Sequence, residues 1–263
     1  VMACIYMRLF RKTNYILALS GNDIFSGGVH HADLTTYTVH KLHGFVAVTC
    51  LTAMTEKGFE VFPTDSAIFA HQLTSLKNVP FSAIKIGLLP NVEIAEQALE
   101  VIQAHQDIPV VLDPVLVCKE THDTEVSQLR DELLKFFPYV TIITPNLAEA
   151  QLLIQRDIQT VEEMKQAARD LYELGAKHVV IKGGNRLDKD KAIDVYYDGQ
   201  TIEVLESPIL TSNNVGAGCT FASNIASQLL LGKDPLEAVR LSKEFVYRAI
   251  ETSDEYGVVQ YEK

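Results

Sequence analysis

Five consecutive residues, Gly216-Ala217-Gly218-Cys219-Thr220, combine a flexible backbone with a reactive side chain. Two glycines in three positions let the chain turn sharply and bring its N–H groups close to a ligand. The apolar run that follows, 221–231, predicts a buried helix. A glycine loop that opens a helix binds anions, because its N–H groups and the helix dipole both point at the negative charge. Cys219 would lie in the first helical turn, where the pKa of a thiol is usually lowered.

A phosphate held beside an activatable thiol predicts phosphoryl transfer. The competing interpretation is a flexible turn before a core helix, and for a GxG pattern alone that interpretation would be the better one. The rest of the chain decides between them, because other reactive side chains follow short apolar runs that are typical of buried strands. These are Asp23 after 15–19, Asp113-Pro114 after 109–112, Thr144-Pro145-Asn146 after 140–143, and Lys182-Gly183-Gly184 after 178–181.

These side chains are predicted to share one site. In open α/β sheets, ligands bind outside the carboxyl ends of the strands, and all four groups would lie along that edge. Singly, Asp and Asn are ordinary turn and cap residues. Together with a lysine and a glycine loop, they favour a common site.

The residue types suggest a role for each position. Lys182 would neutralise transferring phosphate oxygens as a point charge. Asn146 and Glu149, three residues apart, would share one face of a helical turn and hold Mg²⁺ directly or through water, with Asp113 as a second metal ligand. The loop N–H groups would stabilise charge on a γ-phosphate, and Cys219 would accept a hydroxyl proton as general base. The Walker A pattern GxxxxGK[ST] does not occur, and no GxGxxG follows the first strand.

The elements that position these residues alternate along the chain. Helices are predicted at 29–42, 64–76, 92–105, 124–136, 147–154, 161–174, 218–231 and 235–252, and further strands at 45–51 and 81–86. The runs 192–197 and 201–205 flank Asp198-Gly199-Gln200, which predicts a hairpin. This alternation predicts an α/β fold of three layers, αβα, with a mostly parallel central sheet and antiparallel strands at one edge. No repeat or linker is evident, so we expect one domain over 1–263.

Composition narrows the possible partners. The chain has 263 residues, is 47% hydrophobic and carries a net charge of −11 without a basic cluster, which argues against nucleic acid and anionic membranes. Its four cysteines form no CxxC pair, so we expect a reducing, cytoplasmic location. Residues 1–13 are apolar and then basic, the reverse of a signal peptide, and we interpret them as an N-terminal extension, with a short added strand as the alternative.

The motifs of this chain resemble those of the ribokinase-like superfamily and, within it, of the vitamin kinases: pyridoxal kinase and hydroxymethylpyrimidine (phosphate) kinase. The matching stretches run in family order over nearly the whole chain. They are Ser26-Gly27-Gly28 with Ala32-Asp33-Leu34, Ile84-Lys85-Ile86-Gly87-Leu88-Leu89, Asp113-Pro114-Val115, Ile143-Thr144-Pro145-Asn146-Leu147-Ala148-Glu149-Ala150, Val180-Ile181-Lys182-Gly183-Gly184 and Gly216-Ala217-Gly218-Cys219-Thr220.

The resemblance implies an ATP- and Mg²⁺-dependent kinase that phosphorylates the 5′-hydroxymethyl group of a B6 vitamer, and it implies a homodimer. Catalysis would rest on Cys219, Cys118 and the loop Gly216, Ala217 and Gly218. Nucleotide would be bound by Asn146, Glu149, Lys182, Gly183, Gly184 and Thr211, metal by Asp113 and Glu149, and the vitamer by Asp23, Met54, Leu88 and Cys118.

Two positions bear on which vitamin the protein would phosphorylate. Hydroxymethylpyrimidine kinases typically carry glutamine where Met54 aligns, and a thioether cannot make the same hydrogen bonds to an aminopyrimidine. The stretch from Asp113 to Lys119 resembles the lid entrance of the Gram-positive pyridoxal kinases, which also has a cysteine at the position of Cys118, although a small buried filler is an equal interpretation of that residue.

The chain also departs from the family pattern. The first loop, 21–26, is one residue longer than usual, and Val29-His30-His31 replaces a more regular sequence where the substrate ring would lie. Hydroxymethylpyrimidine kinase is therefore the main alternative function, with dual activity possible. A nucleotide-binding module without turnover and a sugar kinase are less favoured alternatives.

Overall fold

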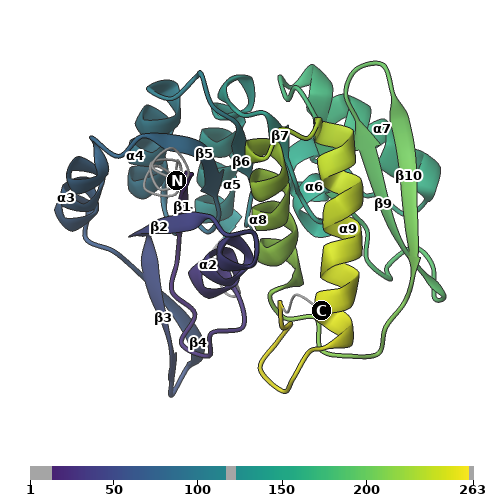
Figure 1. The fold of residues 1–263 in the computed structure, drawn as a ribbon. Helices are drawn as coiled ribbons and strands as arrows, with labels where there is room; N and C mark the ends of the chain where they lie inside the picture. Colours follow the sequence, from purple (N-terminus) through teal and green to yellow (C-terminus); the bar gives the residue numbers. More distant parts are fainter. Residues whose placement is uncertain (1–13, 117–122, 261–263) are drawn as a thin grey trace, which may run out of the picture.

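A computed structural model describes residues 14–116 and 123–260, and the expected extension 1–13 and Cys118 lie outside them. An eight-stranded sheet runs through the molecule in the order β10-β9-β8-β7-β6-β5-β1-β2 (Figure 1). The strands are β1 (Tyr15–Ser20), β2 (His43–Val48), β5 (Phe81–Ile86), β6 (Val110–Leu112), β7 (Ile142–Ile143), β8 (Val179–Lys182), β9 (Lys191–Tyr197) and β10 (Ile202–Pro208). In this sheet, the neighbouring strands β2, β1, β5, β6, β7 and β8 pair in parallel. Strand β9 is antiparallel to both β8 and β10.

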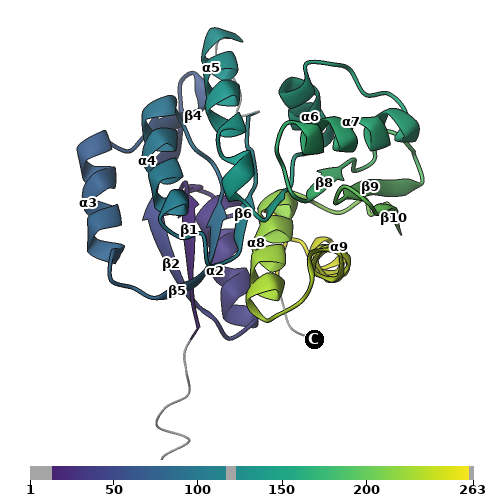
Figure 2. The same ribbon diagram turned by 90° about the horizontal axis from the view of Figure 1, so that it is seen from above.

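Helices cover both faces of this sheet, as the view along the layers shows (Figure 2). One face carries α2 (Val29–Val39), α8 (Ala217–Leu230) and α9 (Pro235–Glu251). The other carries α3 (Ser66–Leu76), α4 (Val92–Gln103), α5 (Asp123–Leu134), α6 (Leu147–Ile154) and α7 (Val161–Glu173), with a short 3-10 helix η1 (Phe137–Tyr139) before β7. The predicted three-layer αβα fold with a mostly parallel sheet is confirmed.

Each strand contributes side chains to both layers, because successive residues point to opposite faces. In β1, Leu17 and Leu19 pack into the core beneath α3–α7, whereas Ile16 and Ala18 pack beneath α2, α8 and α9. Such doubly buried strands appear in sequence as continuous apolar runs rather than as alternating ones. This explains why the short runs were recognisable as strands.

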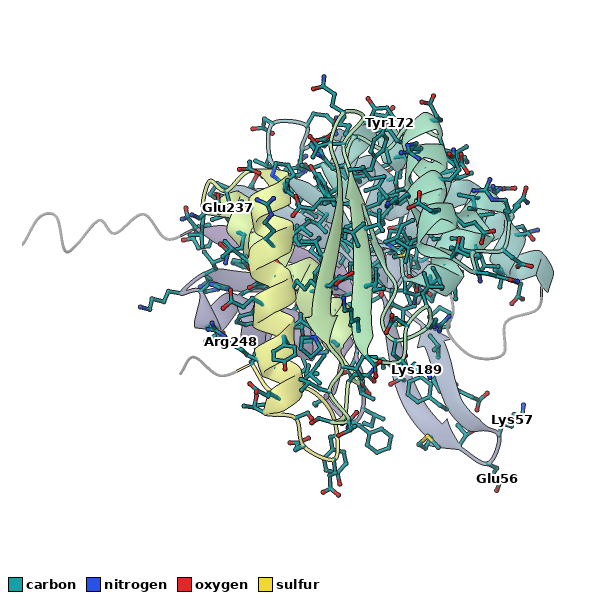
Figure 3. All side chains as sticks on the ribbon, turned by 90° about the vertical axis from the view of Figure 1, so that its right-hand side faces the viewer. Glu56, Lys57, Tyr172, Lys189, Glu237 and Arg248 are labelled. Carbon is teal, nitrogen blue, oxygen red and sulfur yellow. The ribbon has the colours of Figure 1, made fainter. Side chains whose placement is uncertain are left out.

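One predicted strand is wrong in its extent. The run 45–51 was expected to be continuous, but the chain leaves the sheet at Thr49, whose hydroxyl donates to the carbonyl of Leu88 at 2.6 Å. The next residues form β3 (Cys50–Thr55), which pairs only with β4 (Gly58–Pro63) in a separate antiparallel sheet. The tip of this hairpin, marked by Glu56 and Lys57, projects away from the body (Figure 3).

The predicted edge hairpin is confirmed as β9 and β10, which pair in antiparallel register. Gly199 in its turn has φ +94, a left-handed conformation that glycine adopts without steric cost. Within the described ranges, no helix is both long and apolar enough to cross a lipid bilayer.

Candidate active site

The glycine loop lies at the start of α8, at the carboxyl edge of the parallel strands. Gly216 is the N-cap of this helix with φ +84, and a Cβ built on it would lie 1.8 Å from the carbonyl oxygen of Gly27. Any side chain at this position would therefore collide with the loop that follows β1. Ala217 and Gly218 form the first turn of the helix. The Ala217 N–H donates to the Asn214 carbonyl at 3.1 Å, and the first-turn N–H groups that lack an intrahelical partner favour an anion.

Three neighbouring strand ends meet at one carboxylate. Asp113, after β6, accepts hydrogen bonds from the Lys182 ammonium at 2.8 Å and the Thr144 hydroxyl at 2.9 Å. The Lys182 Nζ also lies 3.3 Å from the position a Cβ on Gly218 would occupy. The structure thus brings the lysine, the aspartate and the glycine loop together, as the edge rule predicts.

Asn146 and Glu149 are arranged differently from the expected shared helix face. Asn146 is the N-cap of α6 and its side chain accepts from the Glu149 N–H at 2.9 Å, while the Glu149 carboxylate accepts from the Asn146 N–H at 2.8 Å. This reciprocal pair is a capping box, a motif that the spacing Asn-x-x-Glu indicates in sequence. The Asn146 amide oxygen is therefore already engaged with the helix.

Two carboxylates nevertheless remain beside the lysine. Glu149 is 4% exposed, and burial raises its pKa to about 7, with a further increase from Asp113 that Lys182 opposes. Burial alone would lower the pKa of Lys182, but the carboxylates of Asp113 and Glu149 raise it overall. No cluster of three or more His, Cys, Asp or Glu side chains suited to a metal occurs in the described part of the chain. Mg²⁺ commonly takes only one or two carboxylates and completes its shell with water and phosphate, so Asp113 and Glu149 fit such a site.

A cavity of about 470 Å³ adjoins this cluster and is large enough for a nucleotide portion. Its lining includes most of the predicted nucleotide-binding and loop residues: Asn146, Lys182, Gly183, Gly184, Ala217 and Gly218. Thr211 is exposed and does not line it. Sequence reasoning missed the wall supplied by α9, where Lys243 forms an ion pair with Asp194 at 2.7 Å beside Tyr247 and Ile250. Lys243, Tyr247 and Ile250 lie on an ordinary amphipathic helix, which gives no functional signal in sequence.

The predicted vitamer-binding residues occupy separate places. The Asp23 carboxylate accepts from the N–H groups of Phe25, Gly27 and Gly28 at 3.0–3.1 Å, so it shapes the loop that follows β1. Leu88 lines a second cavity of about 650 Å³, bounded by the β3–β4 hairpin and the loop after β6. Met54 lies on β3 and is 57% exposed, opposite Phe59.

The expected low pKa of Cys219 is wrong for this state of the protein. Burial raises the pKa of the thiol to about 11, and this outweighs the lowering effect of Lys85 and of a hydrogen bond from the Val29 N–H. Val29 donates this bond from a left-handed backbone conformation, φ +44, which is uncommon for a β-branched residue. The helix N-terminus therefore positions the sulfur, but desolvation keeps it protonated.

A buried ion pair beneath Cys219 was also missed. The Lys85 ammonium on β5 lies 2.8 Å from the Asp33 carboxylate on α2, and both side chains are fully buried. Ser223, one helical turn after Cys219, donates to the same carboxylate. The sequence contained a signal, since a lysine within an apolar strand needs a buried partner.

Known proteins resemble this chain over most of its length. A sequence model of the phosphomethylpyrimidine kinase family matches residues 23–262. Pyridoxine kinase of Bacillus subtilis is 39% identical over 90% of each chain, and hydroxymethylpyrimidine/phosphomethylpyrimidine kinase of Aquifex aeolicus is 34% identical over 92% of this chain and 96% of that protein. The solved pyridoxal kinase of Staphylococcus aureus in complex with pyridoxal superposes with a TM-score of 0.87 at 36% identity, covering 94% of this chain and 93% of that one.

The glycine loop at the start of α8, the Lys182–Asp113 pair and the three-layer sheet thus occur in a sequence that matches one family over nearly its full length. The chain belongs to the phosphomethylpyrimidine kinase family of ribokinase-like kinases.

Proposed function

We propose that this protein transfers the γ-phosphate of ATP to the 5′-hydroxymethyl group of a B6 vitamer: pyridoxal, pyridoxine or pyridoxamine. The observation that carries the proposal is the meeting of the glycine loop, Lys182 and Cys219 at one sheet edge. The relatives support it, because pyridoxine kinase of Bacillus subtilis is 39% identical and the Staphylococcus aureus pyridoxal kinase has the same fold.

The chemistry follows from these groups. The substrate hydroxyl oxygen forms a bond to the γ-phosphorus as the bond to the β-phosphate oxygen breaks, and the hydroxyl proton passes to the Cys219 sulfur. Lys182 and the N–H groups of the glycine loop stabilise the charge on the transferring oxygens. With a pKa of about 11, only about one thiol in ten thousand is ionised at pH 7, so the base role requires this pKa to fall when the site is filled.

Mg²⁺ would be held by Asp113 and Glu149 and would neutralise phosphate charge there. Replacing Glu149 with glutamine should raise the Mg²⁺ concentration for half-maximal rate, because a carboxylate is lost from a hard-cation site. Glutamine keeps the reciprocal cap with Asn146, so helix α6 should be retained. The test is a Mg²⁺ titration of turnover for both proteins at one fixed pH, and identical midpoints would leave Asp113 as the sole carboxylate ligand.

Hydroxymethylpyrimidine kinase is the second candidate, because the family model and the Aquifex aeolicus relative carry that description. Met54 argues against it, since a thioether offers an aminopyrimidine no amide. A coupled ADP-release screen over pyridoxal, pyridoxine, pyridoxamine and hydroxymethylpyrimidine tests the proposal directly. Turnover with hydroxymethylpyrimidine alone would overturn it, and no stimulation by any of the four would favour a binding module or a different acceptor.

Cys118, in the stretch that resembles a lid entrance, offers a further test. Thiols add reversibly to aldehydes, and pyridoxal carries an aldehyde where pyridoxine carries an alcohol. If Cys118 meets the aldehyde, Cys118→Ala should lower kcat/KM for pyridoxal more than for pyridoxine. The two vitamers are compared on wild type and variant in the same assay. Equal, small losses would indicate that Cys118 only fills space.

The family resemblance also leads us to propose a cytoplasmic homodimer. Leu51 and Phe62 are cross-strand partners on the β3–β4 hairpin and are 53% and 46% exposed. A second copy covering this apolar pair would remove it from water. Sedimentation at several protein concentrations tests the dimer, and a monomer throughout would contradict it.

A further inference from the structure

The segment after α9 is hydrogen-bonded to the stretch that precedes the glycine loop. The Asn213 amide donates to the carbonyls of Asp254 and Glu255 at 3.0 and 3.1 Å. The Val258 N–H donates at 2.9 Å to the carbonyl of Val215, which lies two residues after Asn213. The segment 254–260, which we term the C-terminal strap, is therefore held against residues 213–215.

The strap also reaches the helical turn that carries the proposed base. The Gln260 amide donates to the Thr220 hydroxyl at 2.8 Å, and both side chains are buried, with 5% and 0% exposed. Thr220 directly follows Cys219 in the first turn of α8. A shift of the strap at Gln260 would thus be transmitted to the backbone that places the Cys219 sulfur.

Three glycines from distant parts of the chain meet where the strap crosses. A Cβ on Gly27 would lie 2.3 Å from the carbonyl oxygen of Tyr256, and one on Gly257 would lie 2.8 Å from the carbonyl oxygen of Val215. A Cβ on Gly216 would collide with the Gly27 carbonyl, as described above. Backbone packs directly on backbone here, so the loop after β1, the glycine loop and the strap have little freedom to move separately.

The strap touches the loop after β1 a second time, through side chains. The rings of Phe25 and Tyr256 are stacked, with centroids 6.4 Å apart and planes 18° apart. Both remain about half exposed, at 49% and 54%. The other side of the same loop is fixed to the hairpin, where the Ile24 N–H donates to the Thr52 hydroxyl at 3.1 Å.

We propose that the C-terminal strap is a positioning element for phosphoryl transfer, in which Gln260 sets the turn that carries Cys219 and Tyr256 sets the loop after β1. This inference rests on the proposed function. The physical reason is that a misplacement of about 1 Å between reacting groups can lower a rate by about 100-fold. The strap touches no reacting atom, so its residues act through the two loops that they hold.

The first experiment is a double-mutant cycle on kcat with Gln260→Met, Thr220→Val and the double variant. Methionine fills the volume of glutamine but cannot donate, and valine removes the acceptor. We expect each single variant to lower kcat about tenfold and the double variant to be no slower than either, because both changes break the same hydrogen bond. Additive losses, or a kcat within twofold of wild type in both singles, would overturn the role of Gln260.

A matched control separates positioning from general loss of stability. Ser242 accepts a buried hydrogen bond of 2.9 Å from Asn224 on the same helix α8, further from Cys219. Ser242→Ala should lower the melting temperature about as much as Thr220→Val while kcat stays within twofold. An equal loss of kcat in this control would show that any loosening of α8 slows the enzyme, which would contradict a specific role for the strap.

The second experiment uses Tyr256→Ala, a surface change that does not endanger folding. We expect the KM for the vitamer to rise about tenfold while the KM for ATP is unchanged, because the strap then releases only the loop after β1. Leu231→Ala is the control, since Leu231 is 48% exposed and lies at the opposite end of α8, about 20 Å from the first turn of that helix. Equal KM values for Tyr256→Ala and wild type would overturn this part.

The reactivity of the Cys219 thiol can be measured without any vitamer substrate, so it tests the strap independently of the proposed function. The rate at which iodoacetamide alkylates Cys219, located by peptide mass spectrometry, should change at least about threefold in Gln260→Met and not in Ser242→Ala. If wild type phosphorylates no vitamer but this change is seen, the proposed function fails and the strap still positions Cys219. If wild type is active and Cys219 reactivity is the same in all variants, the strap proposal fails alone.

Discussion

Cys219→Ala should abolish phosphorylation of both pyridoxal and pyridoxine while nucleotide binding remains largely intact. Removing a general base costs about 10²–10⁴ in rate, and alanine at this position offers no atom that can accept the hydroxyl proton. Nucleotide affinity should survive because the cavity of about 470 Å³ is lined by Ala217, Gly218 and Lys182 rather than by this side chain. The measurement is kcat/KM for each vitamer, beside calorimetric titration with ADP.

Two comparisons make the result specific. Cys219→Ser keeps the volume but offers a hydroxyl that is far harder to ionise, so it should be nearly as inactive as alanine. Leu231→Ala, at the far end of the same helix, should retain full turnover. An active Cys219→Ala would remove the thiol from the mechanism and make another group near Asp113 the proton acceptor.

Lys182→Ala should reduce turnover by about 10²–10³-fold in a protein that still folds. The transferring phosphate loses a cation that lies above the first turn of α8, in a partly dry site where charge is weakly screened. Asp113 keeps its hydrogen bond from Thr144, so the carboxylate is not left without a donor.

The control for this prediction is Lys191→Ala. Lys191 forms an ion pair with Glu206 on the neighbouring strand, at 2.6 Å, but both side chains are about half exposed and lie outside the cavity. Exposed pairs contribute little to stability, so turnover should stay near wild type. Single-turnover measurements on Lys182→Ala would locate the loss in the chemical step, and an unchanged rate in the folded variant would exclude Lys182 from the site.

The fold was largely predictable because its strands are buried on both faces and its helices are amphipathic or capped, so periodicity carries the information. The β3–β4 hairpin was missed for the opposite reason. Its strands pair only with each other, and exposed residues such as Leu51 and Met54 interrupt the alternation of apolar and polar positions. Local pattern cannot show that a strand leaves a sheet.

The site was predictable where it depends on topology and not where it depends on solvation. Strand ends and a glycine loop brought Asp113, Lys182 and Gly218 to one edge, which the chain order implies. The pKa of Cys219 depends on how much water reaches the sulfur, and only the packed structure shows that. The same holds for Asn146, whose type suits either a metal or a cap until its partner is known.

The buried Lys85–Asp33 pair also limits how this sequence can evolve. Removing either partner alone leaves an uncompensated buried charge, which costs about 3–5 kcal/mol. A typical domain has about 5–15 kcal/mol of stability in total, so one such step removes about a fifth of it or more. The ion pair can be replaced without this loss of stability when both residues are substituted almost together, although two separate segments of the gene encode them. The pair should therefore persist as a linked unit, inherited or lost as one, even where the surface around it has diverged.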